Sequence, residues 1–169
     1  MLLSNSEEII RKAERLIRRF GTRNPWKIAD GLGVNIIEVP LKKQKGMYKV
    51  IKRNRYIFVK QDLDDVMKSI VIWHELGHDQ IHRKLAAEFQ EFNLFDMSKN
   101  TTEYEANLFA AQAMLPDDEI LEYIYMGYDA GQIAQAMNSD INLVALKVTT
   151  LINRGHNFRG IEHRNNFLK

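Results

Sequence analysis

The sequence predicts an α+β fold that is mainly helical and contains a small three-stranded antiparallel sheet. Three observations carry this prediction. Apolar residues recur at helical spacing over most of the chain, three short runs rich in β-branched and aromatic residues follow one another between residues 34 and 59, and no internal repeat interrupts them. A length of 169 residues, with 45% hydrophobic and 27% charged residues, is typical of a globular protein with a core of its own.

Two helices are expected before the strands. The first covers residues 4–20 and ends at Gly21, which suits the position just after a helix. The second covers residues 25–32, because Asn24 is a preferred N-cap residue and Pro25 fits the first helical turn.

The strands are expected at residues 34–39, 46–51 and 56–59, where β-branched and aromatic residues dominate. Residues 53–55 are interpreted as a hairpin turn between the last two runs. A sheet of this size is predicted to precede a long helix from Asp62 to about His82, with Asp62 as its N-cap.

That long helix carries the most informative motif of the chain, His74-Glu-Leu-Gly-His78. Residues four apart share one face of a helix about 6 Å apart, so both imidazoles can reach one metal ion. With Glu75 as general base, this is the pattern of a zinc hydrolase, and the absence of cysteine leaves only nitrogen and oxygen ligands. The alternative is an amphipathic helix with two polar histidines and no metal, which leaves Glu75 and Gly77 unexplained.

A catalytic zinc site commonly has a third protein ligand, and the remaining histidines do not suggest one. His82 continues the four-residue series but is rotated by about 80° from a common focus, so a structural hydrogen bond is expected for it. His156 and His163 are expected to be solvated, in or near a polar and mobile tail that covers residues 157–169.

A carboxylate is the remaining candidate for the third ligand. After a less regular stretch from Leu85 to Phe95, a second long helix is predicted from Thr101 or Thr102 to Leu115. It carries Glu103 and Glu105, which spacing alone does not separate, although Glu105 also stands at capping-box distance from Thr102. Three further helices are expected at residues 117–126, 129–138 and 142–154.

Together with His74-Glu-Leu-Gly-His78, the stretch from Glu103 to Pro116 resembles the ImmA/IrrE family of zinc-dependent peptidases. The matching residues are Glu103, Ala106, Asn107, Phe109, Ala110 and Pro116, whereas Ala113-Met114-Leu115 replaces the more usual Leu-Leu-Met. The resemblance covers most of residues 7–120.

The resemblance implies a gluzincin-like site in which Zn²⁺ is held by His74, His78 and Glu103, with Asn107 supporting a ligand histidine and Glu75 as the catalytic base. It also implies a substrate, because ImmA-like members cleave a partner repressor that carries a helix-turn-helix and so relieve repression. The short length is closer to the ImmA branch, which is typical of phages and integrative elements. The donor for a developing oxyanion stays open among Tyr104, Tyr123, Tyr125 and His156.

Two other functions are kept beside this one. Residues 129–137 and 142–152 resemble a helix-turn-helix, so a DNA-binding regulator with a structural metal site is an alternative, although the second helix is poor in base-reading side chains and direct nucleic-acid binding is not expected. A general cytoplasmic peptidase is the other.

The charge of the chain is unevenly distributed. Residues 1–60 carry 15 Lys and Arg against 5 Asp and Glu (+10), and residues 61–169 carry 9 against 17 (−8). The basic half could attract an acidic protein partner or touch nucleic acid non-specifically, and the alternative is a solvated surface.

The expected organisation is a zinc peptidase core over residues 1–116 and a C-terminal helical segment over residues 117–169, packed on the core or appended to it. The chain has no apolar run of eighteen residues, and its first residues lack the features of a signal peptide. A cytoplasmic protein without membrane contact is therefore expected, and the sequence specifies no oligomeric state.

Overall fold

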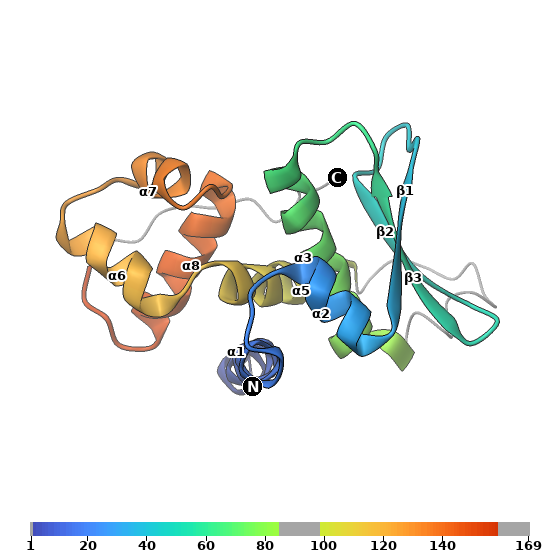
Figure 1. Cartoon of the computed structure of the whole chain (residues 1–169). Helices are drawn as coiled ribbons and strands as arrows, with labels where there is room; N and C mark the ends of the chain where they lie inside the picture. Colours follow the sequence, from blue (N-terminus) through green and yellow to red (C-terminus); the bar gives the residue numbers. More distant parts are fainter. Residues whose placement is uncertain (1, 85–98, 159–169) are drawn as a thin grey trace.

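The computed structural model describes residues 2–84 and 99–158, and within these ranges it contains seven helices and three strands (Figure 1). The elements are α1 (Leu2–Phe20), α2 (Pro25–Leu32), β1 (Val34–Val39), β2 (Gly46–Ile51), β3 (Asn54–Lys60), α3 (Asp65–Ile81), α5 (Lys99–Met114), α6 (Asp117–Tyr125), α7 (Ala130–Ala136) and α8 (Ile141–Asn153). The predicted irregular stretch at 85–95, and residues 159–169 of the predicted tail with His163, lie outside the described residues.

The sheet is mixed, and the prediction of an antiparallel sheet is wrong. The strand β3 lies in the middle, parallel to β1 and antiparallel to β2. It takes this place because its Ile57 and Val59 are fully buried in the core, whereas β2 lies at an edge and stays partly exposed. The hairpin turn is Lys52-Arg53, one residue earlier than predicted, and both residues have the positive φ that a two-residue hairpin turn of type I′ requires.

Helix starts follow local capping chemistry, with some corrections. Asn24 caps α2 by accepting from the Lys27 amide, as predicted. Asp64 caps α3 by accepting from the Met67 amide at 2.8 Å, so the assignment of Asp62 as its N-cap is wrong. Helix α1 begins two residues before the predicted start, and α5 begins at Lys99, so Thr102 lies inside that helix rather than at its cap.

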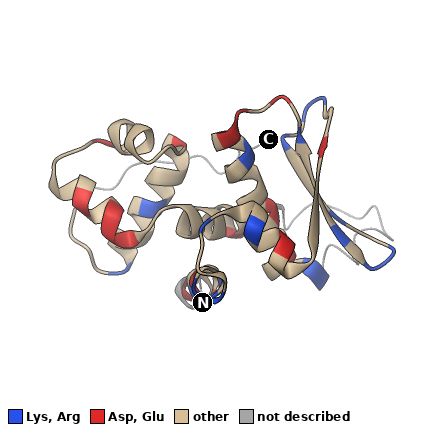
Figure 2. Ribbon diagram, viewed as in Figure 1, with Lys and Arg blue, Asp and Glu red and all other residues tan. Residues whose placement is uncertain are grey.

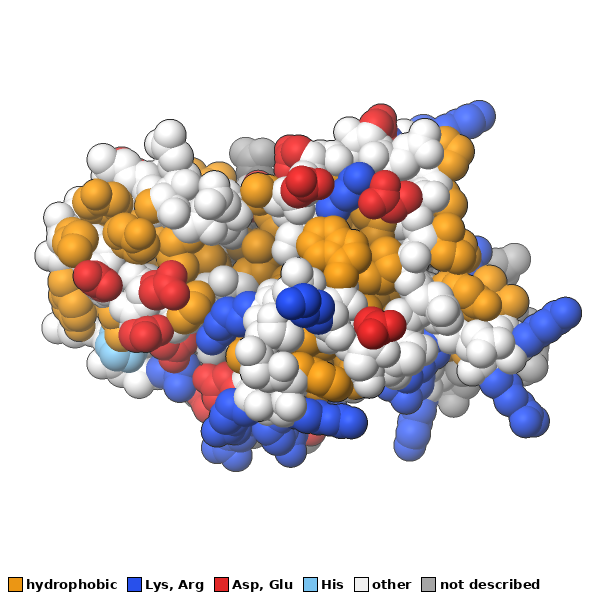
Figure 3. Space-filling model, viewed as in Figure 1, with side chains coloured by type: hydrophobic (Ala, Val, Ile, Leu, Met, Phe, Trp, Pro, Cys, Tyr) orange, Lys and Arg blue, Asp and Glu red, His pale blue; other side chains and the backbone are white. Residues whose placement is uncertain are grey.

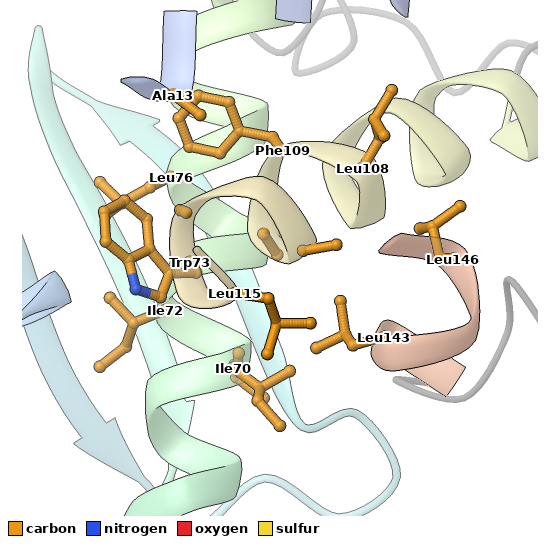
Figure 4. Close-up of a cluster of buried hydrophobic side chains, with 14 of the residues drawn as sticks. Ala13, Ile70, Ile72, Trp73, Leu76, Leu108, Phe109, Leu115, Leu143 and Leu146 are labelled. Carbon is orange, nitrogen blue, oxygen red and sulfur yellow. The ribbon is translucent and has the colours of Figure 1, made fainter. Parts of the chain in front are cut away.

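The helices α3 and α5 cross at the centre of the molecule. A Cβ added at Gly77 would lie 3.1 Å from the Cα of Ala106, so the two backbones approach this closely only because Gly77 has no side chain. Trp73, Leu76 and Phe109 pack around this crossing (Figure 4). The sheet contacts α3 through β2 and β3, while α1 and α8 contact α5. Residues 106–113 of α5 are all buried, because other elements pack around this part of the helix.

The helices α6, α7 and α8 lie on the opposite side of the central pair from the sheet (Figure 1). Leu143 and Leu146 of α8 pack toward Leu115 at the end of α5 (Figure 4). Asp129 and Gln132 form a reciprocal capping box at the start of α7. None of the described helices combines the length and the apolarity needed to cross a lipid bilayer.

Charge is distributed unevenly over these parts. Lys and Arg side chains gather on α1 and around the sheet, whereas α6 begins with three acidic residues, Asp117, Asp118 and Glu119 (Figure 2). The space-filling view shows the same separation, with acidic side chains beside apolar ones at the α6 end of the molecule (Figure 3). The basic excess in the first third of the sequence is therefore carried by two parts of the folded protein, α1 and the sheet.

Candidate metal centre

The centre forms where α3 crosses α5, and the structure brings all three predicted ligand residues to this crossing. His74 and His78 lie one turn apart on α3, and their Nε2 atoms are 3.2 Å from each other. The carboxylate of Glu103, near the start of α5, lies across both rings: Oε2 is 3.3 Å from His74 Nε2, and Oε1 is 3.4 Å from His78 Nε2. One ligand atom from each residue can be chosen so that all lie within 4.8 Å of one another.

These separations fit a tetrahedral metal ion. At metal–ligand distances of about 2.0–2.1 Å, two donor atoms of a tetrahedral centre lie about 3.3–3.4 Å apart. The donor set of two imidazoles and one carboxylate is also the set found in several catalytic zinc sites. His74 is buried, while Glu103 and His78 keep 25% and 17% exposed side chains, so the cluster reaches solvent on their side.

The far side of the His74 ring is fixed by Asn107, the residue for which the family resemblance implies this role. Asn107 is fully buried and its Oδ1 lies 2.8 Å from His74 Nδ1. Because an amide oxygen only accepts, His74 donates from Nδ1 and keeps the lone pair of Nε2 free to face the centre.

The structure separates the two glutamates that spacing could not. Glu103 lies against the histidine pair, while Glu105 points away from it and lies 2.7 Å from His82 Nε2. The capping role considered for Glu105 is wrong, since α5 starts well before Thr102. His82 makes the structural hydrogen bond expected for it, and burial lowers its pKa against the raising effect of Glu105.

Glu75 lies beside the centre but is not part of the three-residue cluster. Its carboxylate accepts a hydrogen bond from the backbone N–H of Tyr48 on β2. Gly46 on the same strand leaves room for it, since a Cβ there would lie 3.1 Å from Glu75 Oε1 and would overlap Val71. Burial raises the pKa of Glu75 to about 7, with Glu103 adding to the shift and His78 opposing it.

The ionisation of Glu103 is favoured by its neighbours. Burial raises its pKa, but His74 and His78, whose Nε2 atoms lie 3.3 and 3.4 Å from its oxygens, outweigh burial and hold that pKa well below the ordinary value. The buried Glu75 and the partly exposed Glu103 thus have opposite tendencies, with Glu103 ionised and Glu75 able to take up a proton near neutral pH. This is the division that a ligand and a general base require.

Sequence reasoning missed a buried network that fixes β2 and β3 to α3. Asp79, whose side chain is 0% exposed, accepts from the Tyr48 hydroxyl at 2.7 Å and pairs with Arg55 at 2.9 Å. Tyr48 therefore contacts both Glu75, through its N–H, and Asp79, through its hydroxyl. One signal was available: Asp79 lies three residues after Leu76 on the same helical face, where a charged residue needs a buried partner.

The four residues considered as oxyanion donors lie in other surroundings. The Tyr104 hydroxyl bonds to Ser6 on α1, and Tyr123 packs against Tyr128 at 5.3 Å between ring centroids. Tyr125 is 75% exposed, and the ring of His156 lies 6.0 Å from that of Phe158. None of them belongs to the cluster formed by the described residues.

The chain is similar to one protein family and to two individual proteins, and all three matches include this centre. A family model described as IrrE N-terminal-like domain, peptidase M78, matches residues 29–149. An "uncharacterized immunity region protein 2" of Bacillus phage phi105 is 35% identical over 136 residues, which cover 79% of this chain and 85% of that protein. A "metallopeptidase ImmA" of Bacillus subtilis (strain 168) is 30% identical over 136 residues, which cover 79% of each.

Proposed function

The chain belongs to the peptidase M78 family of IrrE- and ImmA-like metallopeptidases, and we propose that it is a zinc-dependent, site-specific endopeptidase that cleaves a helix-turn-helix transcriptional repressor. The observation that carries the proposal is the cluster of His74, His78 and Glu103 donor atoms at 3.2–3.4 Å separations, with Glu75 beside it. The donor chemistry supports zinc, because a site without thiolates that combines imidazole and carboxylate suits this ion.

The roles of the residues follow from their positions. His74, His78 and Glu103 would hold the ion, with His74 oriented by Asn107. A zinc ion there supplies a positive charge that polarises the scissile carbonyl and makes a water acidic enough to attack near neutral pH. Glu75 accepts the proton of the attacking water and passes it to the leaving amine, and the Tyr48 N–H and the space beside Gly46 hold its carboxylate in place for this.

The repressor substrate comes from the family resemblance and is supported by the relatives' names. One relative is named for an immunity region of a phage and another is named a metallopeptidase. A transcriptional repressor acts on DNA in the cytoplasm, so our proposal includes a cytoplasmic location for the peptidase.

The DNA-binding alternative receives no support from the C-terminal helices. Residues 143–148 of α8, the second helix of the supposed helix-turn-helix, are all buried. A recognition helix must offer one face to the major groove, and α8 has already buried its side chains against α5 and α7.

We also propose the division into a peptidase core of residues 1–116 and a C-terminal segment from residue 117, packed on the core. All donor residues precede Pro116, and α8 packs on α5. The match of the family model extends to residue 149, which supports a segment that belongs to the family fold rather than an unrelated addition.

The direct test is incubation of the purified protein with the helix-turn-helix repressor encoded beside its gene, with and without a chelator. One cleavage product that disappears with the chelator and returns with zinc is expected. Glu75→Gln should keep zinc and lose roughly 10²–10⁴-fold in rate, whereas Glu122→Gln on the exposed face of α6 should cut normally.

Digestion of casein at a comparable rate would instead support a general peptidase. Normal cleavage by the Glu75 variant would remove that residue from its role. Salt-dependent DNA binding without any cleavage would favour the regulator.

A further inference from the structure

A histidine–carboxylate pair lies directly behind His78, on the side away from the donor cluster. His82 Nδ1 is 3.1 Å from His78 Nδ1, and His82 Nε2 is 2.7 Å from Glu105 Oε2. We propose that His82 and Glu105 are positioning residues, which fix the tautomer and the ring orientation of His78 for metal binding. This inference rests on the metal centre of the proposed function but not on the identity of the substrate.

The two facing ring nitrogens determine the direction of the hydrogen bonds. His78 Nε2 faces the centre, 3.2 Å from His74 Nε2, and must carry a lone pair to bind a cation. A neutral His78 then carries its proton on Nδ1 and donates to Nδ1 of His82. His82 in turn carries its proton on Nε2 and donates to Glu105. With a cation bound at His78 Nε2, every ring nitrogen of the two residues would have a partner and both rings would be neutral.

The end of this chain is anchored to a third helix. Glu105 Oε1 accepts from the side-chain amide of Asn5 on α1, while its Oε2 faces His82. The side chains of His82 and Glu105 are only 8% and 12% exposed, so water competes little for these hydrogen bonds. Asn5, Glu105 and His82 therefore connect α1 and α5 to the end of α3 that carries His78.

The backbone places His82 where it can act in this way. His82 is the C-cap residue of α3, and its N–H still bonds to the carbonyl of His78 at 2.9 Å. Its ring is tilted by 50° to that of His78, with centroids 5.2 Å apart, so it lies behind the ligand ring rather than beside it. His82 is thus excluded as a ligand by position and retained as a support.

The two ligand histidines are consequently supported in different ways. His74 donates to a neutral amide, Asn107, whereas His78 donates to an imidazole that is itself bonded to a carboxylate. A carboxylate at the end of such a chain raises the basicity of the ligand nitrogen, and loss of comparable supports costs roughly 10–100-fold in metal affinity. We therefore expect the loss of the His82 hydrogen bond to weaken metal binding by His78 more than the loss of a packing contact of the same size would.

The test compares two substitutions of similar size. His82→Asn keeps an acceptor near the position of Nδ1, and His82→Leu removes it. We expect His82→Leu to weaken zinc binding roughly 10–100-fold in chelator competition and to change the visible spectrum of the Co²⁺-loaded protein, with most of both effects restored in His82→Asn. Glu105→Gln should weaken binding less, and should add nothing to His82→Leu. His156→Leu, a histidine outside the cluster, is the matched control and should bind zinc normally.

A second measurement needs no variant and stays decisive if His82→Leu does not fold. In ¹⁵N NMR spectra of the zinc-loaded protein, His78 should carry its proton on Nδ1 and His82 on Nε2. The opposite tautomer of His82, or folded Leu and Asn variants with equal zinc affinity, would overturn the proposal. Absence of zinc binding by the unaltered protein would refute the proposed function itself, whereas normal zinc chemistry without repressor cleavage would refute only the substrate.

Discussion

The two ends of α5 each carry a partly buried polar cluster, and the clusters differ in where their positive charge comes from. Near the C-terminal end, Lys147 of α8 donates to Gln112 and to Asp117, and Arg154 pairs with the same Asp117 at 2.7 Å. Near the N-terminal end, Glu103 faces only the two imidazoles of His74 and His78 among the described ion pairs.

This difference separates a structural cluster from a binding site. A buried carboxylate is costly unless a cation or hydrogen-bond donors compensate it. At Asp117 the chain supplies that cation itself, and burial lowers the pKa of Lys147 to about 8 against the raising effect of Asp117. At Glu103 the nearest partners are the two imidazoles, whose Nε2 atoms must be free of protons to bind a metal ion, so a bound cation would then compensate this carboxylate. Substitutions in the Glu103 cluster should therefore change zinc binding, whereas substitutions in the Asp117 cluster should change stability alone.

The largest expected difference is the response to zinc. With free zinc a thousandfold above its dissociation constant, the free energy of unfolding should rise by about 4 kcal/mol. His74→Ala or His78→Ala should abolish this rise together with zinc content, because metal binding adds to folding free energy. Calorimetry with and without zinc measures the effect, with His156→Ala as control. Unchanged zinc content in both variants would eliminate the assignment.

A second difference concerns pH in the zinc-free protein. The pKa of Glu75 is about 7 in the fold and 4.5 ordinarily, so between these values the folded state binds more protons than the unfolded state. The free energy of unfolding should therefore fall as pH rises from 4.5 to 7, by up to about 3 kcal/mol. Denaturation of Glu75→Gln against pH isolates this contribution. A variant whose pH dependence equals that of the unaltered protein would contradict the burial of an ionisable Glu75.

The cluster at the other end should affect stability alone. Lys147→Met removes one donor from both Gln112 and Asp117 and should lower the free energy of unfolding by about 1–3 kcal/mol. We expect a value in the lower part of this range, because Arg154 still pairs with Asp117. Zinc affinity of the folded protein should not change. Lys12→Met on exposed α1, which removes an ion pair with Glu8, should change stability by less than about 0.5 kcal/mol. A large loss of zinc affinity in the Lys147 variant would show that the clusters are coupled.

The smallest expected effect tests the spacing of the helices at the centre. Gly77→Ala gains about 1 kcal/mol in helix propensity, but its Cβ would press on Ala106 and force α3 from α5. Overpacking of this kind costs about 1–3 kcal/mol. We expect the free energy of unfolding to fall by about 1 kcal/mol. Zinc binding should also weaken, because the spacing of α3 and α5 sets the distance from the histidines to Glu103. Gly131→Ala on α7 is the control for zinc affinity, and wild-type affinity in the Gly77 variant would contradict this explanation.

The sequence was most informative where the chemistry is local. The bounds of α2 and of the first two strands, the cap at Asn24, and the pairing of His74 with His78 depend on neighbours within a few residues. Gly77, which the metal-free alternative left unexplained, lies where α3 closely approaches α5, and such an approach gives a reason for a glycine inside a helix.

Features that depend on the relative placement of elements were not accessible in this way. The strand order follows from which strand is buried on assembly, and hydrophobic alternation does not encode it. Whether Glu103 or Glu105 faces the two histidines depends on how α5 is rotated against α3, and the spacing of the two residues does not determine that rotation. The partners of Asp79 and Glu105 come from β2, β3 and α1, so their roles emerge only when these elements meet.

The metal centre is tested most directly by a crystal structure of the zinc-loaded protein with anomalous data collected at the zinc absorption edge. We expect one peak about 2.0–2.1 Å from Nε2 of both His74 and His78 and bonded to Glu103, with Glu75 close by but not bonded. A peak bound elsewhere, or no peak while Lys147 and Asp117 remain paired as described, would contradict the assignment of these ligands.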